Sequence, residues 1–340
     1  MPTSAGPPTA YDGPGRPDRN WGRAVDEPGK PLKVLSIVGA GRSGTTVLAS
    51  ILGEAPQVAS AGEIRWLWRR GVAERRPCAC GSAPADCPVW SPVVSATLAA
   101  VDTEPDRALE RILRAQDEVA ELRHRLRVLR RTSAQATWPA LSLVRRTMDV
   151  ALRTFAETTD ASVVVDSSKR PHDAAVVAAL PDVSHYVLHV VRDPRAVAYS
   201  WRRRKTFTVD GRTRTMGTRG LPGSVKRWTS NSWGAEVLSR HVPPERWLRL
   251  RYEDFCAAPY ESYRAIMGLL EEDGGSPFEG PDVVRLSPGH IVAGNPSRFT
   301  TGSVRITVDE EWRQAMSRRD RQLIGGATYP LRRRYGYTAG

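Results

Sequence analysis

Residues 32–46 of this 340-residue chain read LKVLSIVGAGRSGTT, and this stretch decides the fold. Its first part is short, mostly apolar and ended by glycine, which is the pattern of a buried strand over 32–38. A helix is expected to follow over 45–53. Backbone N–H groups at such a strand-to-helix turn converge on an anion at the positive end of the helix. The stretch therefore predicts a phosphate-binding loop over residues 39–46.

The loop departs from the nucleotide triphosphatase pattern G-x-x-x-x-G-K-[ST]. Gly39 and Gly44 match its glycines, but Thr45 stands where that pattern has lysine. The missing lysine is the one that reaches the β- and γ-phosphates, so γ-phosphoryl transfer is less favoured. The cation of this loop is Arg42. A packing role for a glycine-rich turn is the alternative interpretation.

Three further segments are predicted to be buried strands, over 162–166, 184–191 and 247–251. Strands that alternate with helical stretches indicate an α/β fold with a doubly wound parallel sheet flanked by helices. Ligands of such sheets bind at the carboxyl ends of the strands. The phosphate loop lies at one of these ends.

A second motif follows the strand over 184–191. Asp193-Pro194 after Arg192 is a helix-start signal, and Ser200 comes eight residues after the arginine. Arg192 and Ser200 can then meet across one or two helical turns. Alone, the motif could be an exposed N-cap with a surface arginine. Two such motifs at strand ends both lie where ligands bind in these sheets, which makes a purely structural interpretation harder to sustain.

These motifs resemble the sulfotransferase family, including its bacterial members, over most of the folded chain. The family's 5′-phosphosulfate loop has a basic residue followed by Ser-Gly-Thr-Thr, as in residues 42–46, and its 3′-phosphate site has the Arg-Asp-Pro opening with the later serine. The resemblance implies a P-loop-like fold. It also implies in-line transfer of a sulfuryl group from 3′-phosphoadenosine 5′-phosphosulfate to a hydroxyl or amine of a glycan, lipid or small molecule, with adenosine 3′,5′-bisphosphate as the second product.

The resemblance also implies roles for individual residues. Glu63 would be the catalytic base, and Arg42 would stabilise charge on the leaving phosphate. By its position after the strand over 162–166, and not by the resemblance, Lys169 could stabilise the bridging or sulfuryl oxygens. His172 and His290 are alternative bases, and Arg251 and Tyr252 are expected to be structural. The residues expected to bind the nucleotide are Gly41, Arg42, Ser43, Gly44, Thr45, Thr46, Arg192, Ser200 and Arg298.

The remaining chain is expected to form a disordered leader over 1–30 and one sulfotransferase domain over 31–340, with a helical insertion over about 70–160 after the first βα unit. Apolar residues at helical spacing predict one amphipathic helix over 106–131. This helix either packs on the sheet or covers the acceptor site. Trp66, Trp68 and Trp90 could line an acceptor pocket, and the acceptor and the oligomeric state stay open.

Cys78, Cys80 and Cys87 form the one cluster of cysteines. Three cysteines without a local fourth ligand fall short of the usual zinc set, so a structural element is expected, with a disulfide in some states and no metal. Four cysteines in all fit a reducing compartment. No apolar run is long enough for a membrane span, and the first thirty residues lack a secretory core, so a cytoplasmic location is expected.

The formal net charge of +13 predicts attraction to anions. Nucleic acid, an acidic membrane surface and a charged nucleotide are all such anions, but the sequence has no nucleic-acid motif and no nucleic-acid partner is expected. Two other functions stay as alternatives. They are a magnesium-dependent nucleotide kinase with a degenerate loop and a non-catalytic basic protein that binds nucleic acid.

Overall fold

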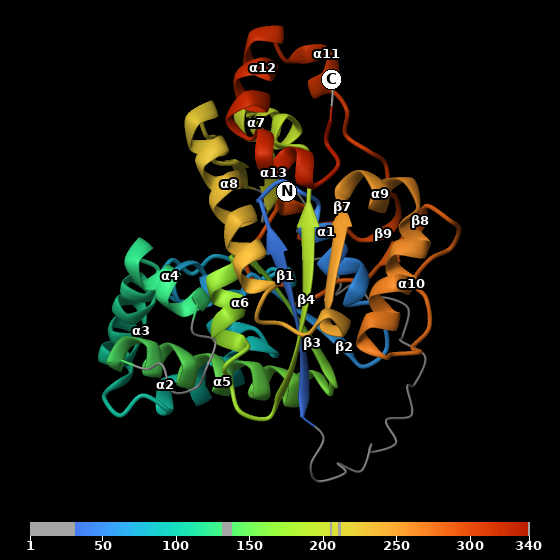
Figure 1. Cartoon of the computed structure of the whole chain (residues 1–340). Helices are drawn as coiled ribbons and strands as arrows, with labels where there is room; N and C mark the ends of the chain where they lie inside the picture. Colours follow the sequence, from blue (N-terminus) through green and yellow to red (C-terminus); the bar gives the residue numbers. More distant parts are fainter. Residues whose placement is uncertain (1–30, 131–137, 205, 210–211, 339–340) are drawn as a thin grey trace, which may run out of the picture. The chain divides into compact units, whose positions relative to one another are not determined.

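The computed structural model describes residues 31–130, 138–204, 206–209 and 212–338, so the expected leader lies outside the described residues. At its centre is a five-stranded sheet in the order β2-β3-β1-β4-β7 (Figure 1). All four neighbouring pairs are parallel, which confirms the predicted sheet. The strands are β1 (Leu32–Gly39), β2 (Val58–Gly62), β3 (Val163–Lys169), β4 (Val183–Val191) and β7 (Trp247–Arg251).

One face of the sheet packs against the helices of the middle of the chain. Val34 and Val38 of β1 are buried there, in one cluster with side chains of α5 (Pro139–Thr159), α6 (Pro171–Val177) and α8 (Leu221–Leu238). Alternate residues of a strand point to the same face, so two residues four positions apart share this cluster.

The other face packs against a second set of helices. Leu35 and Ile37 are completely buried beside α1 (Thr45–Leu52) and α10 (Pro259–Leu270). Full burial of a side chain of this size contributes about 1.5–3 kcal/mol. Because both faces of β1 are covered by helices, the strand is held rigidly, and so is the start of the loop that follows it.

A largely helical segment connects β2 to β3. It contains η1 (Ile64–Trp66), the π-helix η2 (Leu67–Ala73), η3 (Pro84–Asp86), α2 (Trp90–Ala99), α3 (Pro105–Val119), α4 (Leu122–Arg130) and α5. The strand β2 separates this segment from the first βα unit. The sequence analysis did not predict that strand.

The prediction of one helix over 106–131 is wrong, because the described part of it forms α3 and α4. The chain leaves the helix at Ala120, and the Glu118 carbonyl oxygen accepts a hydrogen bond from His124 Nδ1 at 2.8 Å. Leu122, expected on the apolar face, is 64% exposed. Since α3 packs against α5 while α4 packs against α6 and α8, one straight helix could not make both contacts.

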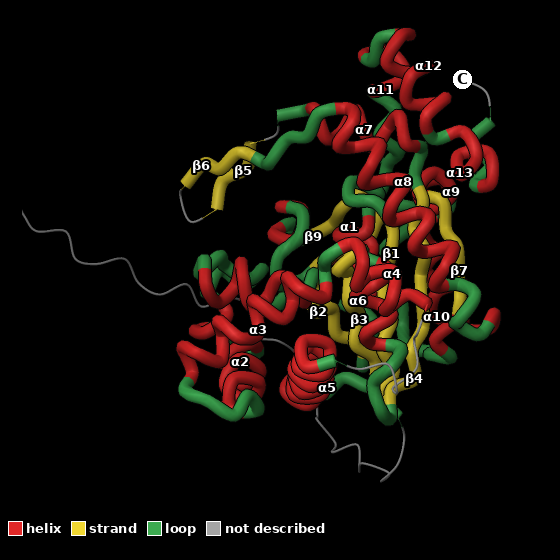
Figure 2. The backbone as a smooth tube through the Cα atoms, turned by 60° about the vertical axis from the view of Figure 1, so that its left-hand side comes forward, coloured by secondary structure: helices red, strands yellow, loops and turns green. Residues whose placement is uncertain are grey.

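The rest of the chain adds short helices and two strand pairs to this framework. Its helices are α7 (Pro194–Arg202), η4 (Pro244–Arg246), α9 (Tyr252–Ala257), η5 (Pro296–Phe299), α11 (Trp312–Ala315), α12 (Arg318–Ala327) and α13 (Tyr329–Arg334). Two antiparallel pairs complete it, β5 (Thr206–Val209) with β6 (Arg212–Thr215), and β8 (Val283–Leu286) with β9 (Gly302–Arg305). Figure 2 shows the β5–β6 pair standing apart from the central sheet. Among the described residues, no helix has the length and apolar character needed to cross a membrane.

Candidate functional site

A cavity of about 820 Å³ lies at the carboxyl end of the sheet. Each of the five strands has a lining residue at its end or within three residues after it: Arg42, Glu63, Lys169, Arg192 and Tyr252. This is the place where ligands bind in open parallel α/β sheets. The cavity therefore lies where the sequence analysis expected the site.

The phosphate loop is held by close contacts of its glycines. Gly39 has a φ of 145°, and a Cβ atom there would lie 2.1 Å from the carbonyl oxygen of Val190. Gly44, with a φ of 76°, is the N-cap of α1, and a Cβ there would lie 2.9 Å from the ring of Tyr252. Asn231 of α8 donates a hydrogen bond to the Gly39 carbonyl at 2.8 Å. The predicted turn from strand to helix is confirmed.

Arg42 takes an unusual backbone conformation, with a φ of 74°. Its guanidinium lies over the ring of Trp201, 4.5 Å from the centroid, and its Nη2 is 3.4 Å from the carbonyl oxygen of Gly217. Burial, with a smaller contribution from Arg203, lowers the pKa of Arg42. Its charge is therefore poorly compensated, and an anion in the cavity would stabilise it.

Arg192 connects the two predicted motifs directly. Its Nη1 donates to the backbone carbonyl of Arg42 at 2.8 Å, and its Nη2 donates to the backbone carbonyl of Asp309 at 2.8 Å. The guanidinium lies 4.2 Å from the centroid of the Tyr252 ring. Within the described structure its buried Nε has no hydrogen-bond partner. Ser200, from α7, lines the same cavity.

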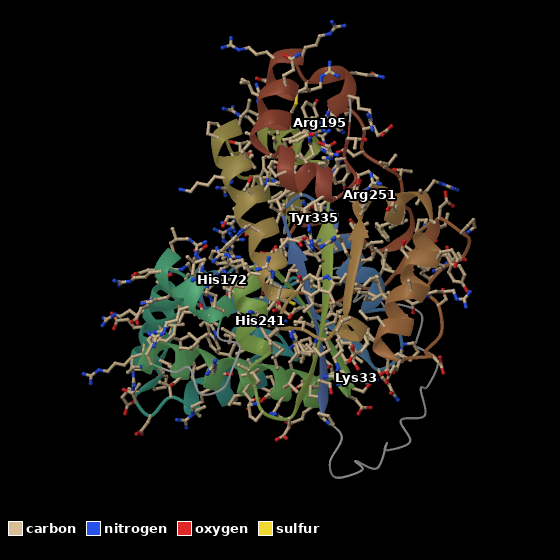
Figure 3. The ribbon with its side chains drawn as sticks, viewed as in Figure 1. Lys33, His172, Arg195, His241, Arg251 and Tyr335 are labelled. Carbon is tan, nitrogen blue, oxygen red and sulfur yellow. The ribbon has the colours of Figure 1, made fainter. Side chains whose placement is uncertain are left out.

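The helix that carries Ser200 begins as the sequence predicted. Asp193 caps α7, and its side chain accepts a hydrogen bond from the backbone N–H of Arg195 at 2.8 Å. Arg195, labelled in Figure 3, also pairs with the Asp193 carboxylate through its guanidinium and does not line the cavity. This arrangement fixes the first turn of α7 beside Arg192.

Glu63 and Lys169 form an ion pair inside the cavity lining. The register between β1 and β3 shifts before Lys169, and the register between β2 and β3 shifts before Gly62, which precedes Glu63. Such bulges redirect the side chains that follow them. Lys169 has a φ of 70°, a costly conformation for a residue with a side chain. Sequence analysis predicted a role for both residues but not their contact.

Arg298 enters the cavity from the segment that connects β8 to β9. Asn295 caps η5 by accepting from the backbone N–H of Ser297 at 3.1 Å, and Arg298 Nη1 donates to the carbonyl of Gly294 at 3.2 Å. Its Nη2 donates to the carbonyl of Pro77 at 3.3 Å. Burial lowers the pKa of Arg298 to about 10. The segment is therefore tied to the start of the cysteine cluster.

The cavity lining is strongly cationic. Among the described lining residues, two carboxylates, Glu63 and Asp309, face ten cations: Arg42, Arg70, Arg76, Lys169, Arg170, Arg192, Arg219, Arg227, Arg298 and Arg305. The lining arginines whose pKa is lowered, in each case first by burial, are Arg42, Arg70, Arg170, Arg227 and Arg298. Crowded, partly desolvated cations of this kind mark a site for a multiply charged anion.

Several of these residues were missed by the sequence analysis. Arg70, Arg76, Arg170, Arg219 and Arg227 carry no motif, and a chain with 50 Lys and Arg residues gives no signal that separates them. Tyr252, expected to be structural, lines the cavity beneath Arg192. Arg251 does not line it, and its guanidinium lies 4.6 Å from the centroid of the Tyr337 ring.

Some predicted candidates lie outside the cavity. Ser43 is buried next to the lining, and its hydroxyl has no hydrogen-bond partner within the described structure. Trp66 lines the cavity, whereas Trp68 and Trp90 are buried in the core. Neither α3 nor α4 contributes a lining residue among those described, so their role as an acceptor cover stays a prediction.

The two histidines named as alternative bases are also outside the lining. Burial lowers the pKa of His172 to about 3, so its imidazole is neutral in the folded protein. His290 lies beside the three clustered cysteines, and the four potential ligand atoms are within 4.8 Å of one another. The sequence analysis considered nearby ligands alone, whereas the fold brings a potential fourth ligand from a segment about 200 residues further along the chain.

The fold is a P-loop-like α/β fold, and the cavity at the carboxyl end of its sheet is strongly cationic. A family model described as the sulfotransferase family matches residues 35–273, more than half of the chain. The chain therefore belongs to the sulfotransferase family, as its motifs indicated.

Solved structures support the fold. The sulfotransferase domain of the Synechococcus PCC 7002 olefin synthase aligns with a TM-score of 0.50 and 16% identity over 92% of this chain and 98% of that one. The sulfotransferase domain from the curacin biosynthetic pathway aligns with a TM-score of 0.51 and 14% identity over 92% of this chain and 100% of that one. A search of curated proteins finds no match.

Proposed function

We propose that this protein transfers the sulfuryl group of 3′-phosphoadenosine 5′-phosphosulfate to a hydroxyl or amine of a small-molecule, lipid or glycan acceptor. The observation that carries the proposal is the hydrogen bond from Arg192 to the backbone of Arg42. It joins two strand-end motifs in one cationic cavity, and this donor has two separate phosphate-bearing ends. A site for a simple monophosphate would need only one of the motifs.

The residues present fit such a donor. The cavity volume of about 820 Å³ lies within the usual range for ligand pockets, roughly 300–1,000 Å³. Buried polar atoms near the two motifs have no partner in the described structure: Ser43 Oγ and the Nε atoms of Arg42, Arg192 and Arg298. Buried polar atoms normally have hydrogen-bond partners, so these atoms are what an anionic ligand or its ordered water would satisfy.

The assigned binding roles follow from the position of each group. Residues 41–46 would hold the 5′-phosphosulfate end with their backbone N–H groups and the hydroxyls of Thr45 and Thr46 at the start of α1. Arg192, Ser200 and Arg298 would hold the 3′-phosphate. The donor, once bound, supplies an activated sulfuryl group with a phosphate as its leaving group.

Glu63 is proposed to accept the proton of the acceptor hydroxyl. The acceptor oxygen then bonds to sulfur as the bond from sulfur to the phosphate oxygen breaks, and the negative charge leaves on the phosphate. Lys169 pairs with Glu63 in this structure and would stabilise that charge by moving toward the departing oxygen. The pair thus holds base and cation within one hydrogen bond of each other.

Isothermal titration calorimetry tests the proposal directly. We expect adenosine 3′,5′-bisphosphate to bind without magnesium and ATP with magnesium to bind far more weakly. Tight binding of magnesium ATP alone would instead support a nucleotide kinase. Incubation with sulfur-labelled donor and a panel of hydroxyl and amine acceptors then tests transfer itself, and binding without transfer to any of them would contradict the enzymatic part of the proposal.

A further inference from the structure

A cluster of metal-ligating side chains lies outside the cavity lining. Its members are Cys78, Cys80, Cys87 and His290, and we call them the Cys–His cluster. We propose that the Cys–His cluster binds one structural zinc ion. This inference is independent of the proposed reaction, because it rests on four residues that no step of that reaction uses.

The spacing of the ligand atoms fits tetrahedral zinc. Zinc–sulfur bonds of about 2.3 Å and zinc–nitrogen bonds of about 2.0–2.1 Å give ligand separations of about 3.8 Å between sulfurs and about 3.6 Å between sulfur and nitrogen. The three sulfur–sulfur distances here are 3.3, 3.9 and 3.6 Å. His290 Nδ1 lies 3.2 Å from the Cys87 sulfur and 3.9 Å from the Cys78 sulfur.

One of the three sulfurs also accepts a hydrogen bond from a backbone N–H. The amide of Cys80 donates to the Cys78 sulfur at 3.5 Å. Hydrogen bonds of this kind stabilise negative charge on a thiolate ligand and orient it. A purely hydrophobic packing role for the cysteines would not require them.

Two hydrogen bonds fix the backbone at His290, which supplies the fourth ligand. The indole Nε1 of Trp90 donates to the backbone carbonyl of His290 at 2.5 Å, and the amide of Ala79 donates to the carbonyl of Ile291 at 3.0 Å. Cys78 and Cys87 are fully buried, while Cys80 is exposed and leaves a route for the ion. Four protein ligands fill a tetrahedral site and leave no open position, so the role is structural.

The ion would crosslink two segments that build the cavity wall. Residues 77–80 and 290–298 already meet through Ala79 and through the bond from Arg298 to Pro77. The backbone N–H of Glu63 donates to the carbonyl of Val292 at 2.9 Å in the same wall. Zinc at the Cys–His cluster therefore holds in place the backbone next to the Arg298 and Glu63 side chains.

Metal analysis of protein purified under reducing conditions, without an affinity tag that binds metal, tests the proposal. We expect about one zinc per chain by mass spectrometry. After metal removal, Co²⁺ should restore one equivalent with the visible absorption of a tetrahedral cobalt–thiolate centre. Purified wild type that holds no zinc, and whose reduced metal-free form takes up no cobalt, would overturn the proposal even if no variant folds.

Two pairs of variants locate the site. Cys80→Ser and His290→Ala should each lose the bound zinc on dialysis against a chelator that leaves wild type loaded. Cys256→Ser and His241→Ala are the matched controls and should keep it; His241 follows α8 and is labelled in Figure 3. A second, stronger chelator that removes zinc from wild type as well should lower the melting temperature of wild type but not that of Cys80→Ser. Full zinc retention by Cys80→Ser and His290→Ala would place the metal elsewhere and refute the assignment.

Discussion

Glu63→Gln is the sharpest test of the proposed chemistry. The substitution keeps the size of the side chain and one carbonyl oxygen but removes the proton acceptor. If Glu63 is the base, turnover should fall by about 10²- to 10⁴-fold, the usual contribution of a positioned general base. Affinity for adenosine 3′,5′-bisphosphate should not fall, because the cavity loses one of the two carboxylates in its described lining and becomes more positive.

The same substitution should also affect stability. The side chains of Glu63 and Lys169 are only 11% and 13% exposed, so water screens their pairing weakly. Hydrogen bonds to charged groups contribute about 1.5–3 kcal/mol, and the glutamine retains a neutral acceptor for Lys169. The free energy of unfolding should therefore fall by no more than this amount, and turnover must be measured well below the melting temperature.

A second ion pair provides the matched control. Lys33 Nζ lies 2.9 Å from Glu272 Oε1, with side chains 25% and 17% exposed, and Lys33 is at the opposite end of β1 from the cavity (Figure 3). Glu272→Gln should lower stability slightly and leave turnover unchanged. The assay is chromatographic formation of adenosine 3′,5′-bisphosphate with the best acceptor of the screen. Near-normal turnover of Glu63→Gln, or an equal loss in both variants, would refute the assignment of Glu63 as the base.

Three further substitutions test other parts of the site and the core. Arg192→Ala should weaken binding of adenosine 3′,5′-bisphosphate about 10- to 100-fold by calorimetry, since a charged hydrogen bond is worth about 1.5–3 kcal/mol. Arg202→Ala, at the exposed end of the helix that follows Arg192, should not weaken it. Gly294→Ala, at a φ of 107°, should cost about 1–3 kcal/mol in urea unfolding, and an unchanged midpoint would contradict the strain. Burial lowers the pKa of His189 from 6.5 to about 3. Below pH 6.5 this histidine takes up a proton in the unfolded chain but stays neutral in the folded protein, so the free energy of unfolding falls as the pH falls from 6.5 toward 3. Between pH 8 and pH 5 the free energy of unfolding should therefore fall by about 2 kcal/mol less in His189→Leu than in wild type, and an equal fall in both proteins would contradict this.

The elements that were predicted best from the sequence are those that neighbouring residues specify. β1 is a buried strand ended by Gly39, and α7 begins at an Asp-Pro cap, so a few neighbouring residues specify each of them. The strand β2, with the sequence VASAG, was missed because small residues have low strand propensity. It lies at the edge of the sheet, where it pairs with β3 and forms one further bridge from Gly62 to Val292, and neither pairing is encoded locally.

The site was predictable where a motif carried it and unpredictable where long-range packing did. The phosphate loop and Arg192 each belong to a recognisable pattern, and the structure places both in one cavity. The contact between Glu63 and Lys169 depends on two bulges, whose positions the sequence pattern does not indicate. His290 joins the cysteines from a distant segment, so no spacing rule for nearby ligands could have included it.

The hydrogen bond from Arg192 to the Arg42 carbonyl means that the two phosphate motifs are not energetically separate. Residues that share a hydrogen bond show coupled rather than additive effects when both are changed. The loss expected for Arg192→Ala therefore has two sources, a missing contact to the 3′-phosphate and a loosened 5′ loop. Adenosine 5′-phosphosulfate, which lacks the 3′-phosphate, separates them. Its affinity should fall in this variant by the loop contribution alone, and no fall at all would mean that the bond to Arg42 does not support the loop.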